Sequence, residues 1–242
     1  MTKEPLVVYW APAVDINDGS WDLLYEEPVN LYSYLMSDKN PNRGLTNYLL
    51  CPSASRKFKK SYMITQPMDS SYFYDFTDKE KPVIAPLTQG ALNCNVIRPS
   101  TINAGPTIEF SLRYIFFAEE SLNARFTPPM FHPAKHTKYG TTIPGDMDIG
   151  SWFRPFPLEM QLWGDSGEIN FEEGEPLFYV EFDTEREIIL KRFSFDQELH
   201  NYAKHCVSFY NQEYSLIKRY NRFKVTKMNE MVLKAIKENT LD

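Results

Sequence analysis

Two hydrophobic patterns divide this chain. Up to about residue 192, short apolar or alternating runs are separated by turn-forming residues, as at residues 6–10, 61–65, 108–112 and 158–163. Alternating apolar and polar side chains are typical of strands with one buried face. All 10 glycines and all 17 prolines lie at or before Pro176, and a proline inside a helix removes a backbone donor. We therefore predict a mainly β region over residues 5–192.

One segment carries a strong local turn signal. Residues 168–182 contain two strand-like runs on either side of an acidic turn, Glu173-Gly174-Glu175. This pattern predicts a β-hairpin. The run at residues 186–193 is also apolar and is predicted to extend the same sheet.

The spacing of apolar residues changes after Phe193. It approaches the 3.6-residue period of a helix, which predicts helices to the end of the chain. Ser194 and Gln197 fit a capping box, which would mark the start of the first helix. The apolar positions that carry the helical pattern are Phe195, Leu199, Tyr202, Cys206, Phe209, Ile217, Tyr220, Met228, Met231, Val232, Ala235 and Ile236. We divide the chain into a β domain, 1–193, and a helical segment, 194–242, packed on that domain or on another subunit.

Composition narrows the fold class. Aromatic residues make up 15% of the 242 residues, and aromatic rings pack well on pleated sheets. We predict a β-sandwich, jelly-roll or β-roll with a C-terminal α-helical segment. No apolar run is long enough to span a bilayer and no signal peptide is visible, so we expect a cytoplasmic protein. The three cysteines, Cys51, Cys94 and Cys206, are far apart, which argues for reduced thiols.

The net charge of -6 argues against a general binder of polyanions. The C-terminal segment nevertheless contains a basic run without an acid, interleaved with Tyr220 and Phe223. A solvated helix face is the favoured interpretation, and contact with nucleic-acid phosphates is the alternative. The residues of this run are Lys218, Arg219, Arg222, Lys224 and Lys227. The same two interpretations apply to the basic residues at 56–60.

Two histidines stand four positions apart. His132 and His136 could share a metal ion with Asp148, or with Asp146 in its place. Pro133 and the lack of an adjacent glutamate exclude the HExxH motif of zinc proteases. The favoured interpretation is a polar loop in which both rings meet solvent or backbone.

Residues 145–155 form the most distinctive loop. Two glycines allow a tight path, and two acids and an arginine stand beside an aromatic pair, so the loop could hold a sugar or a base by stacking and charge pairing. The favoured interpretation is an internal Asp–Arg pair that fixes the loop under an aromatic plug. The candidate ligand-binding residues are Lys135, Asp146, Asp148, Trp152 and Arg154. With the two histidines, we expect the loop residues to line one cleft near the mouth of the β body.

Three stretches together resemble a known family. They are residues 49–54 with 62–69, residues 148–155 and residues 173–184. They are similar to a family of tailed-phage proteins, especially from marine myoviruses, with distant bacterial relatives. The resemblance covers roughly residues 5–195. It implies a phage protein in the cytoplasm of an infected host or in the virion, and it brings no assigned activity.

A second likeness is to the dUTPase and dCTP deaminase group. Residues 146–154 match its acidic, glycine-containing loop that ends in an aromatic and an arginine, and residues 173–182 match the hairpin that follows. This likeness implies a compact β-roll or jelly-roll. The phosphate-binding Arg-Ser element is missing unless Ser55-Arg56 replaces it, and the usual glutamine at the end of the hairpin is absent. We therefore infer no nucleotide hydrolysis from it.

The sequence assigns no catalytic residue and no cofactor, since GxSxG and the common phosphate loops are absent. We predict a phage-encoded, non-catalytic binding or assembly component that forms oligomers or binds another phage or host protein. The alternative is an enzyme for a nucleotide or a sugar, with or without a metal ion, that uses residues 132–154.

Overall fold

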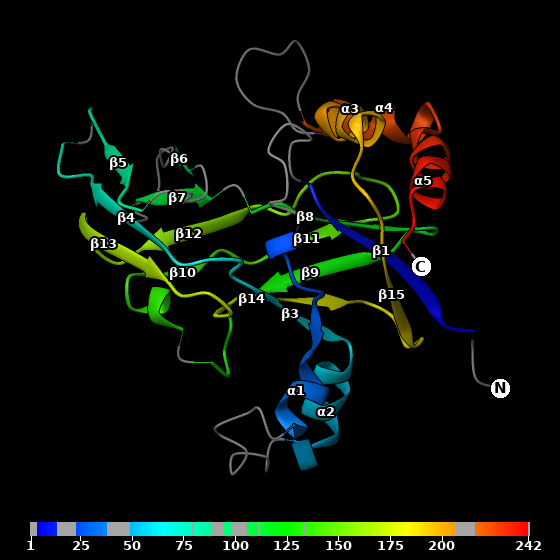
Figure 1. Cartoon of the computed structure of the whole chain (residues 1–242), viewed down its shortest axis with the longest axis horizontal. Coiled ribbons are helices and arrows are strands. Elements are labelled where there is room, and N and C mark those ends of the chain that lie inside the picture. The colour runs from blue at the N-terminus through cyan, green and yellow to red at the C-terminus, as the bar shows by residue number, and fades with distance from the viewer. Residues whose placement is uncertain are drawn as a thin grey trace.

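Helices cover two opposite sides of stacked β-sheets (Figure 1). The computed structural model describes residues 4–13, 23–37, 49–78, 80–88, 94–97, 106–110, 112–132, 134–206 and 216–241. Within these ranges the strands form four sheets. The prediction of a mainly β protein with helices toward the C-terminus is confirmed.

The first sheet has the strand order β15-β1-β8, with β15 at Ile188–Arg192, β1 at Leu6–Pro12 and β8 at Tyr114–Ala118. β1 runs parallel to β15 and antiparallel to β8. Val8 and Trp10 enter the central core, whereas Tyr9 and Ala11 face the C-terminal helices. Because residues 188–192 pair with β1, the prediction that this run extends the sheet of residues 168–182 is wrong.

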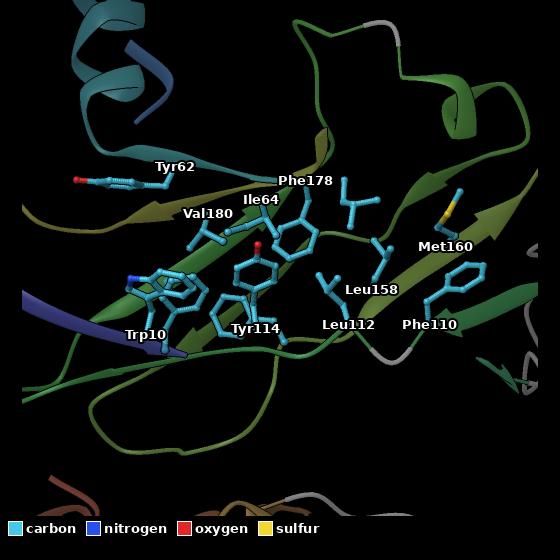
Figure 2. Packing of buried hydrophobic residues seen from close by; sticks show 14 of the residues in the cluster. Trp10, Tyr62, Ile64, Phe110, Leu112, Tyr114, Leu158, Met160, Phe178 and Val180 are labelled. Carbon is cyan, nitrogen blue, oxygen red and sulfur yellow. The ribbon is translucent and has the colours of Figure 1, made fainter. Parts of the chain in front are cut away.

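The second sheet has the order β11-β9-β14-β3-β2. Its strands are β11 (Gly145–Asp148), β9 (Asn123–Thr127), β14 (Pro176–Phe182), β3 (Ser61–Thr65) and β2 (Val29–Asn30). Ile64, Phe178 and Val180 lie across the core from Trp10 and Tyr114 (Figure 2). This aromatic core fixes the two sheets face to face.

The outer face of the second sheet is covered by two short helices, α1 (Leu31–Met36) and α2 (Pro52–Lys59). Met63 and Tyr179 of the sheet form a small apolar cluster with Leu31 and Phe58 of these helices. The layers are therefore C-terminal helices, first sheet, second sheet and helix pair.

Two further sheets extend the body, with the orders β10-β12-β7-β6 and β13-β4-β5. Their strands are β10 (Gly140–Thr142), β12 (Leu158–Leu162), β7 (Thr107–Phe110), β6 (Cys94–Ile97), β13 (Ser166–Phe171), β4 (Ser70–Asp75) and β5 (Val83–Pro86). Leu158 and Met160 continue the central core (Figure 2). The strands predicted near residues 6–10, 61–65, 108–112 and 158–163 are confirmed as β1, β3, β7 and β12.

The predicted β-hairpin at residues 168–182 is wrong, although both of its strands exist. β13 pairs with β4, and β14 pairs with β3. The turn between β13 and β14 lies against the turn between β3 and β4: Gln66 N donates to Glu175 O at 2.8 Å. Glu173 N donates to the Asp69 carboxylate at 2.8 Å. One antiparallel ladder thus bends from one sheet into another at this corner.

The C-terminal helices are α3 (Gln197–Cys206), α4 (Leu216–Val225) and α5 (Met228–Glu238). They pack on the outer face of the first sheet (Figure 1), where Tyr9 and Phe117 meet Leu199 and Val232. A bridge between Phe193 and Thr240 closes the segment onto the sheet. The predicted apolar position 209 lies outside the described residues.

The start of α3 differs from the predicted capping box. The Asp196 carboxylate accepts a hydrogen bond from Leu199 N at 2.9 Å, as an N-cap residue does. Ser194 N instead donates to Asn239 O at 2.8 Å. The cap is therefore Asp196, and Ser194 belongs to the strand-like contact with the end of α5.

Candidate functional site

A groove of about 470 Å³ lies where the loop after β11 meets α4. We call it the junction groove. Its lining residues are Asn123, Phe126, Asp146, Met147, Asp148, Trp152, Arg154, Pro157, Ile217 and Tyr220. Four of the five predicted ligand-binding residues are therefore brought together, Asp146, Asp148, Trp152 and Arg154. Lys135 lies elsewhere and pairs with Glu172.

Asp148 holds the loop after β11 in place. One oxygen accepts from the Ser121 hydroxyl at 2.9 Å, and the other accepts from Leu122 N at 3.2 Å and Gly150 N at 3.1 Å. Its cationic neighbour is Lys224, with Nζ 3.9 Å from Oδ2. Instead of pairing with Arg154, the Asp148 carboxylate accepts hydrogen bonds from the turn between β8 and β9 and from Gly150.

Trp152 forms the aromatic wall between the loop and α4. Its ring lies 5.5 Å from the Tyr220 ring and 6.1 Å from the Phe223 ring, between centroids. Lys224 Nζ stands 4.5 Å from the centroid of the Tyr220 ring, within cation–π range. The predicted aromatic plug therefore exists, and it joins the β body to the C-terminal helices.

Arg154 is the partly buried cation of the groove. Its Nε donates to Pro155 O at 3.4 Å, and the guanidinium makes no ion pair with any residue in the described ranges. Burial lowers the pKa of Arg154, while the charges of Glu109 and Glu159 oppose that shift. The guanidinium remains charged at pH 7. Such a desolvated cation gains free energy from an anionic ligand.

Sequence reasoning missed the acids next to Arg154. Glu109 and Glu159 are directly opposite each other on β7 and β12. Glu109 is 7% exposed, and burial together with the charge of Glu159 raises its pKa. The alternation of apolar and polar residues along 158–162 was the available signal, because it places Glu159 on the face away from the core.

Asp146 lies at the rim of the groove. Its Oδ1 is 3.0 Å from Arg125 Nε, and the two residues are cross-strand partners on β11 and β9. Both side chains are about half exposed, so this ion pair contributes little stability, about 0.2–1 kcal/mol. The charge of Asp146 at the groove is therefore already balanced by Arg125.

His132 lies between the second sheet and α1, away from the junction groove. Tyr179 Oη accepts from Phe131 N at 3.2 Å and also forms a hydrogen bond with His132 Nδ1. The Tyr34 ring covers the imidazole at 5.0 Å between centroids. Burial lowers the pKa of His132 to about 4, so the ring is neutral at pH 7.

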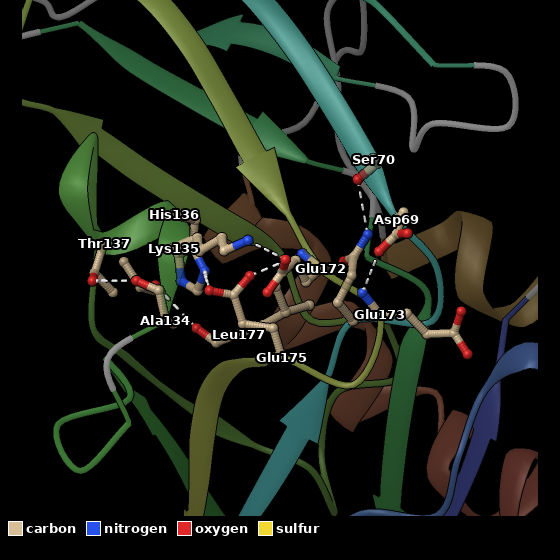
Figure 3. A network of polar contacts seen from close by, with 12 residues as sticks. Asp69, Ser70, Ala134, Lys135, His136, Thr137, Glu172, Glu173, Glu175 and Leu177 are labelled. Carbon is tan, nitrogen blue, oxygen red and sulfur yellow. Dashed lines mark hydrogen bonds and ion pairs between the residues drawn. The ribbon is translucent and has the colours of Figure 1, made fainter.

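His136 is fully buried at the corner between the β3–β4 and β13–β14 turns (Figure 3). Its ring stacks on Phe171 with centroids 5.1 Å apart. Its Nδ1 lies 3.4 Å from Glu175 Oε1, while Glu175 Oε2 accepts from Glu172 N at 2.9 Å. The Lys135–Glu172 ion pair closes this cluster on its exposed side (Figure 3).

The predicted metal ligands are not brought together. His132 contacts Tyr179, His136 contacts Glu175, and Asp148 accepts hydrogen bonds from residues 121, 122 and 150 at the junction groove. Across the part of the chain that the structure describes, no three His, Cys, Asp or Glu side chains are grouped to hold a metal ion. The two histidines also do not lie in the cleft predicted for them, because the described lining of the junction groove includes neither ring.

The five basic residues proposed to contact nucleic acid are split between surfaces. Lys224 lies beside Tyr220 and Asp148, and Lys227 pairs with Glu230 at 3.3 Å. The other three line a second pocket between the helices: Lys218, Arg219 and Arg222. The basic run at 56–60 lies mainly on α2. Arg56, Lys57 and Lys60 pair with acids at 181 and 185, and Lys59 Nζ lies over the Tyr32 ring.

Neither a family model nor a curated protein matches the chain. Among the helices of the described ranges, none has the length and apolar character needed to cross a membrane. The geometry of the two pockets is therefore what any functional proposal must use.

Proposed function

We propose that the protein is a non-catalytic binding component and that the junction groove takes an acidic segment of a protein partner. The observation that carries this proposal is Arg154, a partly buried cation that faces the groove without an ion pair in the described ranges. A carboxylate of the partner would form the hydrogen-bonded pair for which a guanidinium is suited.

The rest of the lining supports a peptide segment as the ligand. Trp152, Met147 and Ile217 supply apolar surface beside Arg154, and Ile217 is 73% exposed. The carboxylates of Asp146 and Asp148 are already paired within the protein, and the charges of Glu109 and Glu159 act on Arg154 without forming an ion pair with it, so the guanidinium can still bind a carboxylate of the ligand. We expect an acidic residue next to an aliphatic or aromatic one in the bound segment.

The resemblance to tailed-phage proteins suggests where this partner belongs. It would be a second copy of this chain, another phage protein or a host protein, met in the infected cytoplasm or in the virion. A nucleotide or sugar enzyme is the rival proposal.

Selection from a random peptide display library tests the proposal. Against the immobilised protein, we expect enrichment of peptides with Asp or Glu next to an apolar residue. Arg154→Gln should remove the acidic preference, and Ile217→Asp should reduce binding overall. Val225→Asp is the matched control, because Val225 is 83% exposed on the same helix and lies outside the groove lining.

Three results would overturn the proposal. One is a peptide pool without acidic enrichment, and another is enrichment that Arg154→Gln leaves unchanged. The third is turnover of a nucleotide or sugar in a substrate screen that Arg154→Gln abolishes, which would establish the enzyme instead.

A further inference from the structure

A second pocket, of about 740 Å³, lies among the three C-terminal helices. We call it the basic pocket. Its lining residues are Lys204 and His205 from the end of α3, Lys218, Arg219, Arg222 and Phe223 from α4, and Met228 at the start of α5. Four lysine or arginine side chains from two helices therefore converge on one hollow, and none of the described lining residues is an acid.

The first turn of α4 adds to the positive potential. Lys218 and Arg219 lie near the N-terminal end of α4, whose first turn carries no acid. The amino end of a helix is already positive, so cations placed there raise the local positive potential further. The local charge is thus opposite to the net charge of -6 of the whole chain.

The basic residues of α4 lie on two different faces of the helix, and this arrangement indicates which shape of anion fits. Ile217, Tyr220 and Lys224 share the face of α4 toward the junction groove, whereas Lys218 and Arg222 are four positions apart on another face and line the basic pocket. A strand of nucleic acid would need a continuous basic track. Cations gathered around a hollow instead fit a compact ligand.

We propose that the basic pocket binds a compact polyphosphate, through its phosphates alone. Arginine guanidinium groups bind phosphate oxygens in a fork and lysine adds a point charge, so Arg222 with Lys204 can contact neighbouring phosphates. Among the described lining residues, Phe223 is only 2% exposed and offers no open face on which a base could stack. We therefore expect inorganic triphosphate to bind as well as a nucleoside triphosphate.

Isothermal titration of the full-length protein with sodium triphosphate at low salt tests this proposal. The double variant Lys204→Gln/Arg222→Gln should weaken binding about tenfold or more, because it removes two charge-assisted contacts. The matched control is Lys224→Gln/Lys227→Gln, which removes the same charge from outside the pocket and should change affinity less than about threefold. Thermal unfolding of both variants verifies that the fold is kept.

Titrations with different ligands distinguish the possible sources of phosphate. ATP that binds within about threefold of triphosphate supports recognition of the phosphates alone, whereas much tighter binding of ATP shows that the base is recognised and contradicts it. Absence of triphosphate binding below about 1 mM overturns the proposal. A single-stranded oligonucleotide that binds more tightly than triphosphate, and that both double variants weaken equally, overturns it in favour of a nucleic-acid surface. None of these results depends on the junction groove.

Discussion

The Trp152 ring lies against the Tyr220 ring, and this contact ties the loop after β11 to α4. Trp152 is 6% exposed and belongs to the apolar cluster between the first sheet and the C-terminal helices. The same contact forms a wall of the junction groove. The site and the docking of the helices therefore depend on one aromatic pair.

Trp152→Ala should be strongly destabilising. Removal of a buried tryptophan leaves a cavity, and we expect the free energy of unfolding to fall by about 3–5 kcal/mol. Trp163→Ala is the control, because Trp163 is 62% exposed and should change stability by less than about 0.5 kcal/mol. Urea denaturation followed by circular dichroism measures both values. A loss below about 1 kcal/mol for Trp152→Ala would show that the helices are held without it.

The strand positions were predictable because burial leaves a pattern along the chain. Residues 6–10 are apolar throughout, since one face of β1 lies in the central core and the other lies under the C-terminal helices. The pairing partners were not predictable. Glu173-Gly174-Glu175 has the composition of a hairpin turn, but its pairing is decided by Gln66 and Asp69, which lie about a hundred positions earlier.

The helix α2 was missed because proline was treated only as an interruption. Pro52 occupies the start of this helix, where its missing N–H costs nothing. Phe58 is the buried residue of α2, and most of its other positions are polar or basic. A helix with so narrow an apolar stripe leaves little periodic signal.

The candidate site was predictable where its residues are close in sequence. Asp146, Asp148, Trp152 and Arg154 come from one loop and line one groove. Ile217 and Tyr220 complete that groove from more than 60 positions further along the chain, and only the packing of α4 reveals them. His132 and His136 are close in sequence, but each ring contacts its own partner, Tyr179 or Glu175, and neither is among the lining residues of the groove.

Gly150→Ala should destabilise the loop that carries Trp152. A Cβ atom at this position would lie 1.9 Å from Glu120 O, a backbone atom of the turn that follows β8, so that turn would have to shift. We expect a loss of about 1–3 kcal/mol and weaker peptide binding in the groove. Gly164→Ala is the control, because its nearest neighbour would be 3.9 Å away. Equal unfolding midpoints for the two variants would contradict this account.

The thiols should differ in reactivity. Cys51 is exposed at the N-cap of α2, where the N–H groups of Ala54 and Ser53 lower its pKa. Burial raises the pKa of Cys206 to about 12. In a Cys94→Ser background, iodoacetamide at pH 7.5 should modify Cys51 at least about a hundredfold faster than Cys206, because the thiolate is the reactive form.

Peptide mapping by mass spectrometry measures the two labelling rates. In urea the two labelling rates should become similar, because unfolding removes both the burial of Cys206 and the helix N-terminus next to Cys51. Rapid native labelling of Cys206 would mean that α3 opens easily from the first sheet.

Acid should destabilise the protein through His132. Its pKa is about 4 in the folded protein, below the ordinary 6.5, so between pH 6.5 and 4 the unfolded chain binds more protons than the folded one. The contribution of the neutral ring is full above pH 6.5 and is lost as the pH falls toward 4. His132→Gln should therefore show a smaller fall in unfolding free energy over this range, measured by urea denaturation at half-unit steps of pH.

The variant Tyr179→Phe tests whether burial or the hydrogen bond lowers the pKa of His132. It removes the hydroxyl that bonds His132 Nδ1 and keeps an aromatic ring of nearly the same size over the imidazole. Stability at pH 7 should fall by about 1–3 kcal/mol, since a buried nitrogen loses its partner. The pH dependence should persist, because burial lowers the pKa of His132. If Tyr179→Phe abolishes the pH dependence, the hydrogen bond rather than burial keeps this imidazole neutral.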